Sequence, residues 1–297
     1  MTKIPIYSVI IPHRDSPELL RRCLKSIPDK KDIQVIIVDD NSSPQKVDFS
    51  YFPGSERKYT EVIYNKDNHG AGHARNLALP RAKGQWLLFA DADDFYTDNA
   101  WELFGQHTND KADIIYFGIT SIDSDSLKAT ERFKTYNKYV QAFVMQPTQV
   151  NENLLRYRHD VPWGKMIRRS LVTTHNIIFG ESRYCNDTLF SCRCALAAHT
   201  IGVEQEAAYC VTESQTSLTR QMSAEAIRIR FCVICEKNIL LREHGLAGYQ
   251  TPFLFYLRQA WHISPRLFGE LIKTGNSYHC QWFREIFRWF KQIIAAR

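Results

Sequence analysis

The sequence predicts an α/β fold: a Rossmann-like, mostly parallel central sheet flanked by helices, followed by a helical C-terminal extension. Residues 7–12 form a short run rich in β-branched side chains, and apolar residues recur at helical spacing across residues 17–27. A second apolar run occupies residues 33–38. A strand, a helix and a strand joined by short connections form a βαβ unit, so the strands should be parallel and should end at one edge of the sheet.

The composition is that of an ordinary globular protein. Of the 297 residues, 44% are hydrophobic and 24% are charged, as in average soluble domains. No run of 18 apolar residues occurs, and residues 1–6 lack the apolar core of a signal peptide, so we expect a cytoplasmic protein. The eight cysteines are expected to be reduced thiols. The pairs Cys192/Cys194 and Cys232/Cys235 lack the second pair that a zinc site needs.

Positive charge is concentrated in the last quarter of the chain. Residues 221–297 carry 11 Lys and Arg against 5 Asp and Glu, which accounts for the whole net charge of +6. We therefore expect two domains, residues 1–220 and 221–297, and an anionic partner for the second. Residues 282–294 have the pattern of a basic amphipathic helix. Such a helix either packs on the first domain or binds an anionic membrane surface. No module that binds nucleic acid is recognised.

A third strand is expected at residues 61–64, and a glycine-containing turn then leads into a helix. Gly70, Gly72 and Arg75 nearly match the dinucleotide fingerprint, but Arg75 replaces its third glycine. Because a Rossmann cofactor turn needs that glycine for close helix packing, we discount NAD and FAD. Glycines at a helix start and a fixed positive charge at Arg75 favour a phosphate group instead.

The most informative stretch is residues 85–96. Its apolar residues predict a buried strand, and Asp91, Asp93 and Asp94 follow that strand directly. Three close carboxylates repel one another, so a divalent cation or a cationic ligand is the natural partner for them. Asp is also a common turn residue, and this stretch alone leaves a plain acidic turn as an equal alternative.

The rest of the first domain continues the alternation of helices and strands. Asp187 lies at the N-terminal edge of a predicted helix, where it either caps the helix or takes part in chemistry. The expected elements are a helix at 99–107, a strand at 113–119, an irregular polar flap at 120–146, renewed structure at 161–169, a helix at 185–198, a strand at 207–212 and helices from 221 onward.

Taken in order, the motifs of residues 6–220 resemble those of the family 2 inverting glycosyltransferases, which have the GT-A fold. A single Asp-x-Asp motif is weak evidence for a family, whereas the whole set of motifs in this order is specific evidence. The matching motifs are Ser8-Val9-Ile10-Ile11-Pro12, Val38-Asp39-Asp40-Asn41-Ser42, Gly72-His73-Ala74-Arg75-Asn76, residues 84–94, Trp163-Gly164-Lys165 and Asn186-Asp187-Thr188-Leu189-Phe190.

The resemblance implies a nucleotide site beside a metal site. Asp40 would lie near the base, with Pro12 beneath it. Asp93, supported by Asp91, would bind Mn²⁺ or Mg²⁺ that bridges the donor diphosphate, and the resemblance favours a UDP donor. Arg14 stands where many relatives have an aromatic ring that stacks on the base. The positions implied to face the nucleotide are Pro12, Arg14, Asp40, Arg75, Asp91 and Ala92.

The resemblance also implies an acceptor side. Asp187 stands at the position of the general base, and Trp163 and Lys165 fall in the segment that lines the acceptor. Asp94 would shape the turn or face the donor sugar. Asn186 departs from the family, which usually has Glu there. A neutral neighbour removes like-charge repulsion and favours an ionised Asp187 that is ready to accept a proton.

The expected function is metal-dependent transfer of a sugar, with inversion, from a nucleoside diphosphate sugar to a hydroxyl of a glycan or a lipid-linked oligosaccharide. The setting would be surface polysaccharide biosynthesis, with the enzyme in the cytoplasm or peripheral on the inner face of the cell membrane. Two alternatives stay open. One is a catalytically silent protein that binds sugar nucleotides or glycans. The other is a phosphohydrolase of the haloacid dehalogenase type, although that family carries its Asp-x-Asp motif on the first strand.

Overall fold

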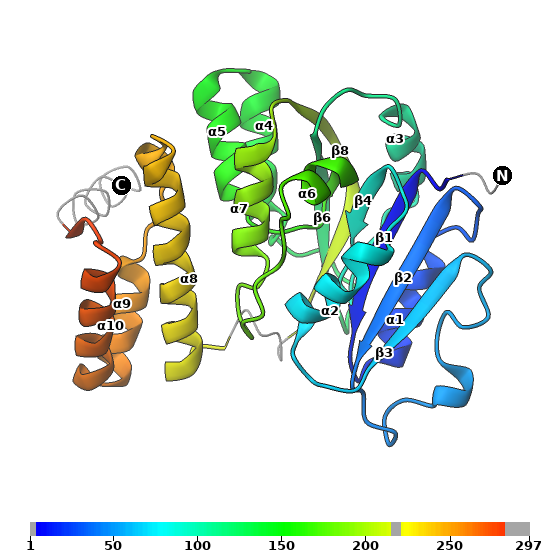
Figure 1. Ribbon diagram of the computed structural model, residues 1–297, viewed down its shortest axis with the longest axis horizontal. Helices are drawn as coiled ribbons and strands as arrows, with labels where there is room; N and C mark the ends of the chain where they lie inside the picture. Colours follow the sequence, from blue (N-terminus) through cyan, green and yellow to red (C-terminus); the bar gives the residue numbers. More distant parts are fainter. Residues whose placement is uncertain (1–3, 215–220, 283–297) are drawn as a thin grey trace. The chain divides into compact units, whose positions relative to one another are not determined.

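The computed structural model describes residues 4–214 and 221–282. The chain divides into two compact units, Met1–Ser214 and Gln215–Arg297. The first unit is built on an eight-stranded sheet in the order β3-β2-β1-β4-β7-β6-β8-β5, part of which is visible in Figure 1. Its strands are β1 (Tyr7–His13), β2 (Ile33–Asp40), β3 (Thr60–Asn65), β4 (Trp86–Phe89), β5 (Phe95–Tyr96), β6 (Ile114–Asp123), β7 (Lys165–Arg168) and β8 (Ile201–Glu213).

The sheet is mostly parallel, as predicted. Strands β3, β2, β1 and β4 are parallel neighbours, and β6 pairs with β8 in parallel. Strand β7 joins the two halves in antiparallel pairing with β4 and β6, and the short β5 is antiparallel to β8. Because parallel strands share one direction, the carboxyl ends of β1, β2, β3 and β4 all lie at one edge of the sheet.

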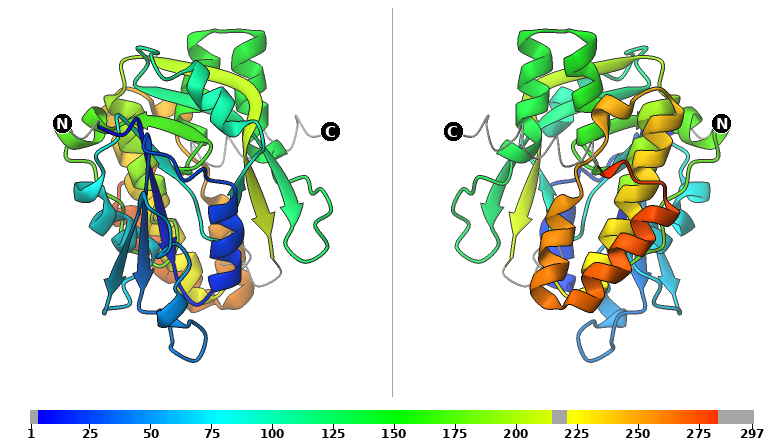
Figure 2. Two further views of the ribbon diagram at one scale, coloured as in Figure 1. Left: turned by 90° about the vertical axis from the view of Figure 1, so that its right-hand side faces the viewer. Right: turned by 90° about the vertical axis from the view of Figure 1, so that its left-hand side faces the viewer.

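Helices cover both faces of this sheet, and Figure 2 shows α1 and α2 on opposite sides of the strands. Alternate residues of β2 therefore enter different cores: Val35 and Ile37 pack with α1, whereas Ile36 and Val38 pack with α2. Burial on both faces explains why the strand is apolar without alternation. The helices are α1 (Pro17–Lys25), α2 (Ala71–Ala78), α3 (Ala100–Gln106), α4 (Lys134–Met145), α5 (Gln149–Arg158), α6 (Arg169–Thr174) and α7 (Thr188–Ala197), with short 3₁₀ turns η1 (Phe49–Tyr51) and η2 (Leu79–Arg81).

The expectation of an irregular flap at residues 120–146 was wrong. Strand β6 continues to Asp123, and α4 occupies much of the remainder. Val140 is buried, and Tyr136, Tyr139 and Phe143 pack partly buried against the core. The helix therefore has an apolar stripe at helical spacing, which the sequence reasoning overlooked.

The second unit contains α8 (Ala224–Glu243), η4 (Ala247–Tyr249), α9 (Leu254–Ile263) and α10 (Pro265–Ser277). The α-helices α8, α9 and α10 pack around their own apolar cluster, which includes Phe231, Phe253 and Leu271. The predicted amphipathic helix at residues 282–294 lies, beyond Trp282, outside the described residues. Within residues 4–214 and 221–282, no helix combines the length and the apolar character that crossing a bilayer requires.

Candidate active site

Three carboxylates gather where β4 ends. Asp91, Asp93 and Asp94 each offer an oxygen, and these oxygens all lie within 4.8 Å of one another. Asp94 is buried, Asp91 is half-buried and Asp93 is exposed. Hard oxygen donors at this spacing fit Mg²⁺ or Mn²⁺, and the exposed Asp93 leaves one side open to a ligand. We call residues 91–94 the acid turn.

Charge repulsion is evident in the acid turn. Desolvation and the nearby charge of Asp91 raise the pKa of Asp93 to about 6. Because Asp93 as a residue is exposed, we assign more of this shift to the repulsion than to desolvation. Burial, followed by repulsion from Asp93 and Asp91, raises the pKa of Asp94 well above its usual value. A cation would relieve both effects, so the residues present fit a divalent metal.

Asp94 anchors the acid turn to β8. The hydroxyl of Tyr209 donates to Asp94 Oδ2 at 3.0 Å, and the backbone amide of Thr212 donates to Asp94 Oδ1 at 2.7 Å. The same Tyr209 oxygen accepts a hydrogen bond from the backbone amide of Asp91 at 2.9 Å. These hydrogen bonds agree with the first role predicted for Asp94, which is to shape the turn. The second role, contact with a donor sugar, stays a prediction.

The carbonyl of Asp93 is held as well. Thr212 Oγ1 donates to it at 2.6 Å, and the guanidinium of Arg22 on α1 also donates to it. Arg22, Tyr209 and Thr212 were missed by the sequence reasoning. Each is at least 71 positions from its partner in the acid turn, and no local pattern marks them.

Arg75 joins the acid turn to the segment that precedes α7. Its guanidinium donates to Asp91 Oδ1 and, at 2.8 Å, to Asn186 Oδ1. Gly72 makes this contact possible, because a Cβ there would meet the backbone oxygen of Gly180 at 1.8 Å. The glycine therefore serves close packing of α2 against residues 180–186.

Asp187 occupies the N-cap position of α7, but within residues 4–214 its side chain makes no capping hydrogen bond. The capping role left open by the sequence is absent. Desolvation raises the pKa of Asp187 to about 6, with Arg75 opposing and Asp91 adding to the shift. A carboxylate with this pKa is ionised at neutral pH and accepts a proton more readily than an ordinary Asp.

The residues predicted near the base differ in their surroundings. The carboxylate of Asp40 accepts hydrogen bonds from the backbone amide of Gly70 at 2.7 Å and from Asn65 Nδ2 at 2.9 Å, so it holds the turn before α2. Pro12 is buried in β1, and Arg14 beside it is exposed. Ala92 is buried within the acid turn.

Trp163 and Lys165 lie in the interior. The Trp163 ring stacks on Tyr209 with centroids 5.5 Å apart at 11°, so it supports the residue that holds the acid turn. The ammonium of Lys165 donates to the backbone carbonyl of His159 at 2.7 Å. Both residues are only 3% exposed. Their predicted place on the acceptor side stays a prediction.

A mostly parallel sheet with an Asp-x-Asp turn at the carboxyl end of β4 is the arrangement found in GT-A glycosyltransferases. Residues 8–175 match the family described as Glycosyl transferase family 2. The chain belongs to this family and is a glycosyltransferase. The phosphohydrolase alternative was wrong, because the match covers the acid turn itself.

Individual relatives agree with this assignment. The chain is 24% identical over 297 residues to the uncharacterized glycosyltransferase EpsJ of Bacillus subtilis, covering 93% of this chain and 84% of that protein. The crystal structure of S. aureus TarS 1–349 is similar with a TM-score of 0.60 at 21% identity, covering 84% of this chain and 71% of that one. The mannosyltransferase PcManGT of Pyrobaculum calidifontis, in complex with GDP-Man and Mn²⁺, gives a TM-score of 0.56 at 14% identity, covering 93% and 76%. These structures share the GT-A fold with this chain.

Proposed function

We propose that this enzyme is a metal-dependent inverting glycosyltransferase. It moves a sugar from a nucleoside diphosphate sugar, preferably a UDP-sugar, to a hydroxyl of a glycan or lipid-linked oligosaccharide in surface polysaccharide biosynthesis. The observation that carries the proposal is the bridge from Asp91 through Arg75 to Asn186, which connects the acid turn with the segment of Asp187.

The relatives supply the substrate class. TarS, for which a structure in complex with UDP-GlcNAc exists, is a poly(ribitol-phosphate) β-N-acetylglucosaminyltransferase of Staphylococcus aureus. The mannosyltransferase binds GDP-Man and Mn²⁺. A UDP-sugar, a divalent cation and a surface glycan are therefore the substrates and cofactor that we propose for this chain.

Each side of the site has a role in the proposed reaction. Asp93 and Asp91 would hold the cation, which would supply positive charge to stabilise the departing diphosphate. The acceptor oxygen bonds to the anomeric carbon as the bond from that carbon to the diphosphate breaks. Asp187 takes the proton of the hydroxyl, and the bonding electron pair leaves with the diphosphate. Attack opposite the leaving group inverts the anomeric centre.

Other residues complete the proposed site. Pro12, Arg14 and Ala92 line the path of the nucleotide, together with Asp40 and Arg75, which position the turns around it. Trp163 and Lys165 belong to the segment that lines the acceptor side. We assign catalysis to a domain of residues 1–220 and treat residues 221–297 as a helical basic extension.

The test is a transfer assay with Mn²⁺ and a panel of nucleotide sugars. Asp93→Ala is expected to abolish donor hydrolysis and transfer, whereas Asp187→Asn is expected to keep donor binding and lose transfer. Normal transfer by Asp187→Asn would show that the base assignment is wrong. Donor binding by the wild type without any turnover would instead favour the silent binding protein.

We also propose that the enzyme works in the cytoplasm at the inner face of the membrane. The support is the basic excess of residues 221–297, which an anionic leaflet attracts. Removal of residues 280–297 is expected to reduce co-sedimentation with vesicles that contain phosphatidylglycerol. Equal binding by the full chain and the shortened chain would contradict this attachment.

A further inference from the structure

Two cysteine thiols are in contact within the second unit. Cys235 is buried in the middle of α8, and Cys280 is half-buried three residues beyond the end of α10. Their sulfur atoms lie 3.4 Å apart, although 45 positions separate them in the sequence. The two residues meet because α8 and α10 pack side by side (Figure 1). A disulfide has a sulfur–sulfur distance of about 2.05 Å, so the sulfurs need to approach by only about 1.4 Å.

Hydrogen bonds to α8 hold the turn that carries Cys280. The hydroxyl of Tyr278 donates to the carboxylate of Glu236, the residue that follows Cys235, at 3.1 Å. The guanidinium of Arg242 donates to the backbone carbonyl of His279 at 3.1 Å. The two residues directly before Cys280 are therefore both bonded to α8, and the contact between the sulfurs does not depend on a single rotamer of an unsupported chain end.

Contacts with α10 fix the turn from the other side. The backbone amide of Cys280 donates to the carbonyl of Gly275 at 2.9 Å. The ring of Trp282 packs directly on Gly275, where no room exists for a Cβ, and its Nε1 donates to Asn276 Oδ1 at 2.8 Å. The same ring lies 5.5 Å from that of Phe253 in the core of the unit. Cys280 is therefore anchored on both sides, which gives the two thiols a high effective concentration.

The two thiols differ in their access to solvent. Cys280 is half-buried, so a small oxidant reaches it first, whereas Cys235 is only 1% exposed and lies directly behind it. Cys232, one turn earlier on α8, is the neighbouring thiol that could compete for Cys280. Burial and the charge of Glu236 raise the pKa of Cys232, so less of it is present as the reactive thiolate. The geometry therefore favours Cys235 as the partner.

We propose that Cys235 and Cys280 are a redox-sensitive pair, which closes into a disulfide when the protein meets hydrogen peroxide. The sulfur of Cys280 bonds to one peroxide oxygen as the O–O bond breaks, and the thiol proton leaves with the other oxygen as water. The sulfur of Cys235 then bonds to the sulfenic sulfur, the S–O bond breaks, and a second water leaves. Two electrons pass from the thiols to the peroxide, and a dithiol reductant reverses the change by thiol–disulfide exchange.

The disulfide would tie the end of the described chain to α8. It closes a loop that contains η4, α9 and α10, and a closed loop restricts the unfolded chain, so the second unit becomes harder to unfold. Cys280 also stands directly before residues 282–294, the segment predicted to be a basic amphipathic helix. The bond would fix the point at which that segment starts, and its chemistry is independent of sugar transfer.

The test treats the full chain with hydrogen peroxide and maps its peptides by mass spectrometry without reduction. One pair of peptides joined through Cys235 and Cys280 is expected, lighter by two hydrogen atoms than the separate peptides, and dithiothreitol should release it. Oxidation should raise the midpoint of thermal unfolding by at least about 5 °C, and Cys280→Ser should abolish this rise. The matched control is Cys232→Ser, which removes a thiol from the same helix and should leave the joined peptides at the wild-type yield.

Several results would overturn the pairing. One is a cross-link through Cys232 in place of Cys235, and another is oxidation of Cys280 to a sulfinic acid with no cross-link at all. A rise in the unfolding midpoint that persists in Cys280→Ser would also contradict it. Modification of the buried Cys23 and Cys194 at the same peroxide concentration would show general oxidation of a loosened fold, which is incompatible with a selective pair.

Discussion

Removal of the Tyr209 hydroxyl is expected to weaken Mn²⁺ binding while the fold persists. In Tyr209→Phe the aromatic ring stays stacked on Trp163. The variant loses two hydrogen bonds at 2.9 and 3.0 Å, one from the amide of Asp91 and one to the carboxylate of Asp94. A hydrogen bond to a charged group contributes about 1.5–3 kcal/mol, so the free energy of unfolding should fall by a similar amount. Loss of a group that orients metal ligands typically lowers metal affinity about 10- to 100-fold.

The assay is calorimetric titration of Mn²⁺ in the presence of UDP, with thermal unfolding of the same samples. Tyr96→Phe is the matched control: Tyr96 is buried with its ring 5.4 Å from that of Tyr209, but its hydroxyl makes a long 3.4 Å contact to the backbone carbonyl of Phe89 and does not touch the acid turn. Its Mn²⁺ affinity should match the wild type. Wild-type affinity in Tyr209→Phe, or an equal loss in Tyr96→Phe, would refute the reasoning.

Three further outcomes are expected. The turnover number should fall as pH drops below about 6, because Asp187, with its pKa near 6, becomes protonated and cannot act as a base; a flat profile between pH 5 and 8 would count against that role. Arg75→Lys keeps the charge but cannot bridge Asp91 and Asn186 together, so donor hydrolysis should slow at least about tenfold, as expected for loss of a charge-assisted hydrogen bond; an unchanged rate would contradict the bridge. Burial, together with the charge of Lys165, lowers the pKa of His159 well below its usual value. The unfolded chain therefore binds a proton that the folded chain does not, and stability measured by urea unfolding should decrease as pH falls below about 6.5, by up to about 1.4 kcal/mol per pH unit; His159→Phe should reduce that slope.

The strands that carry the site were predictable because their signals are local. Residues 33–38 and 85–90 are apolar without alternation, which is typical of strands buried on both faces. The polar residues that follow them, Asp40 and Asp91, must then lie at one edge of a parallel sheet. In contrast, the expectation of irregular structure at residues 120–146 overlooked α4, although Tyr136, Tyr139, Val140 and Phe143 recur at helical spacing and pack against the core.

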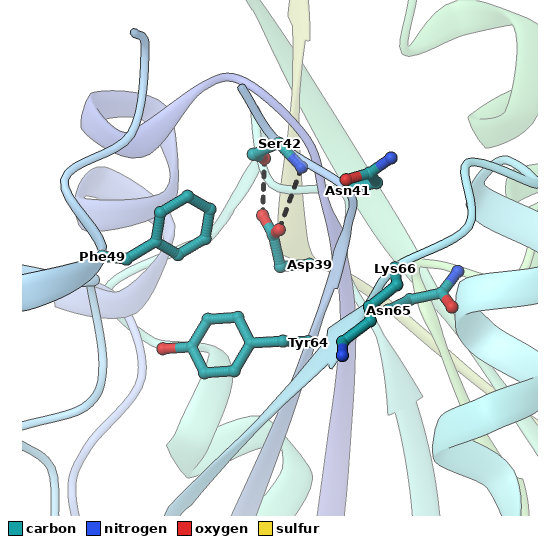
Figure 3. Close-up of a pocket in the computed structure, with 7 residues that line it drawn as sticks. All are labelled: Asp39, Asn41, Ser42, Phe49, Tyr64, Asn65 and Lys66. Carbon is teal, nitrogen blue, oxygen red and sulfur yellow. Dashed lines mark hydrogen bonds between the residues drawn. The ribbon is translucent and has the colours of Figure 1, made fainter. Parts of the chain in front are cut away.

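The residues that line the pocket beyond the carboxyl ends of β2 and β3 (Figure 3) could not have been selected from sequence in the same way. Phe49 and Tyr64 lie in different elements, and single aromatic residues in a sequence are most often part of a core. In the structure both rings stay partly exposed, with Phe52 packed behind them, and only the tertiary structure reveals this.

The sequence by itself determined that a buried strand delivers Asp91 and Asp93 to a sheet edge, because hydrophobic periodicity and clustered charge act over a few residues. Only the tertiary structure decided what holds them. Tyr209, 118 positions from Asp91, reaches the acid turn because β8 pairs with the short β5 that follows it. Long-range contacts of this kind depend on the order of the strands in the sheet. That order is a property of the whole fold, and no local sequence pattern encodes it.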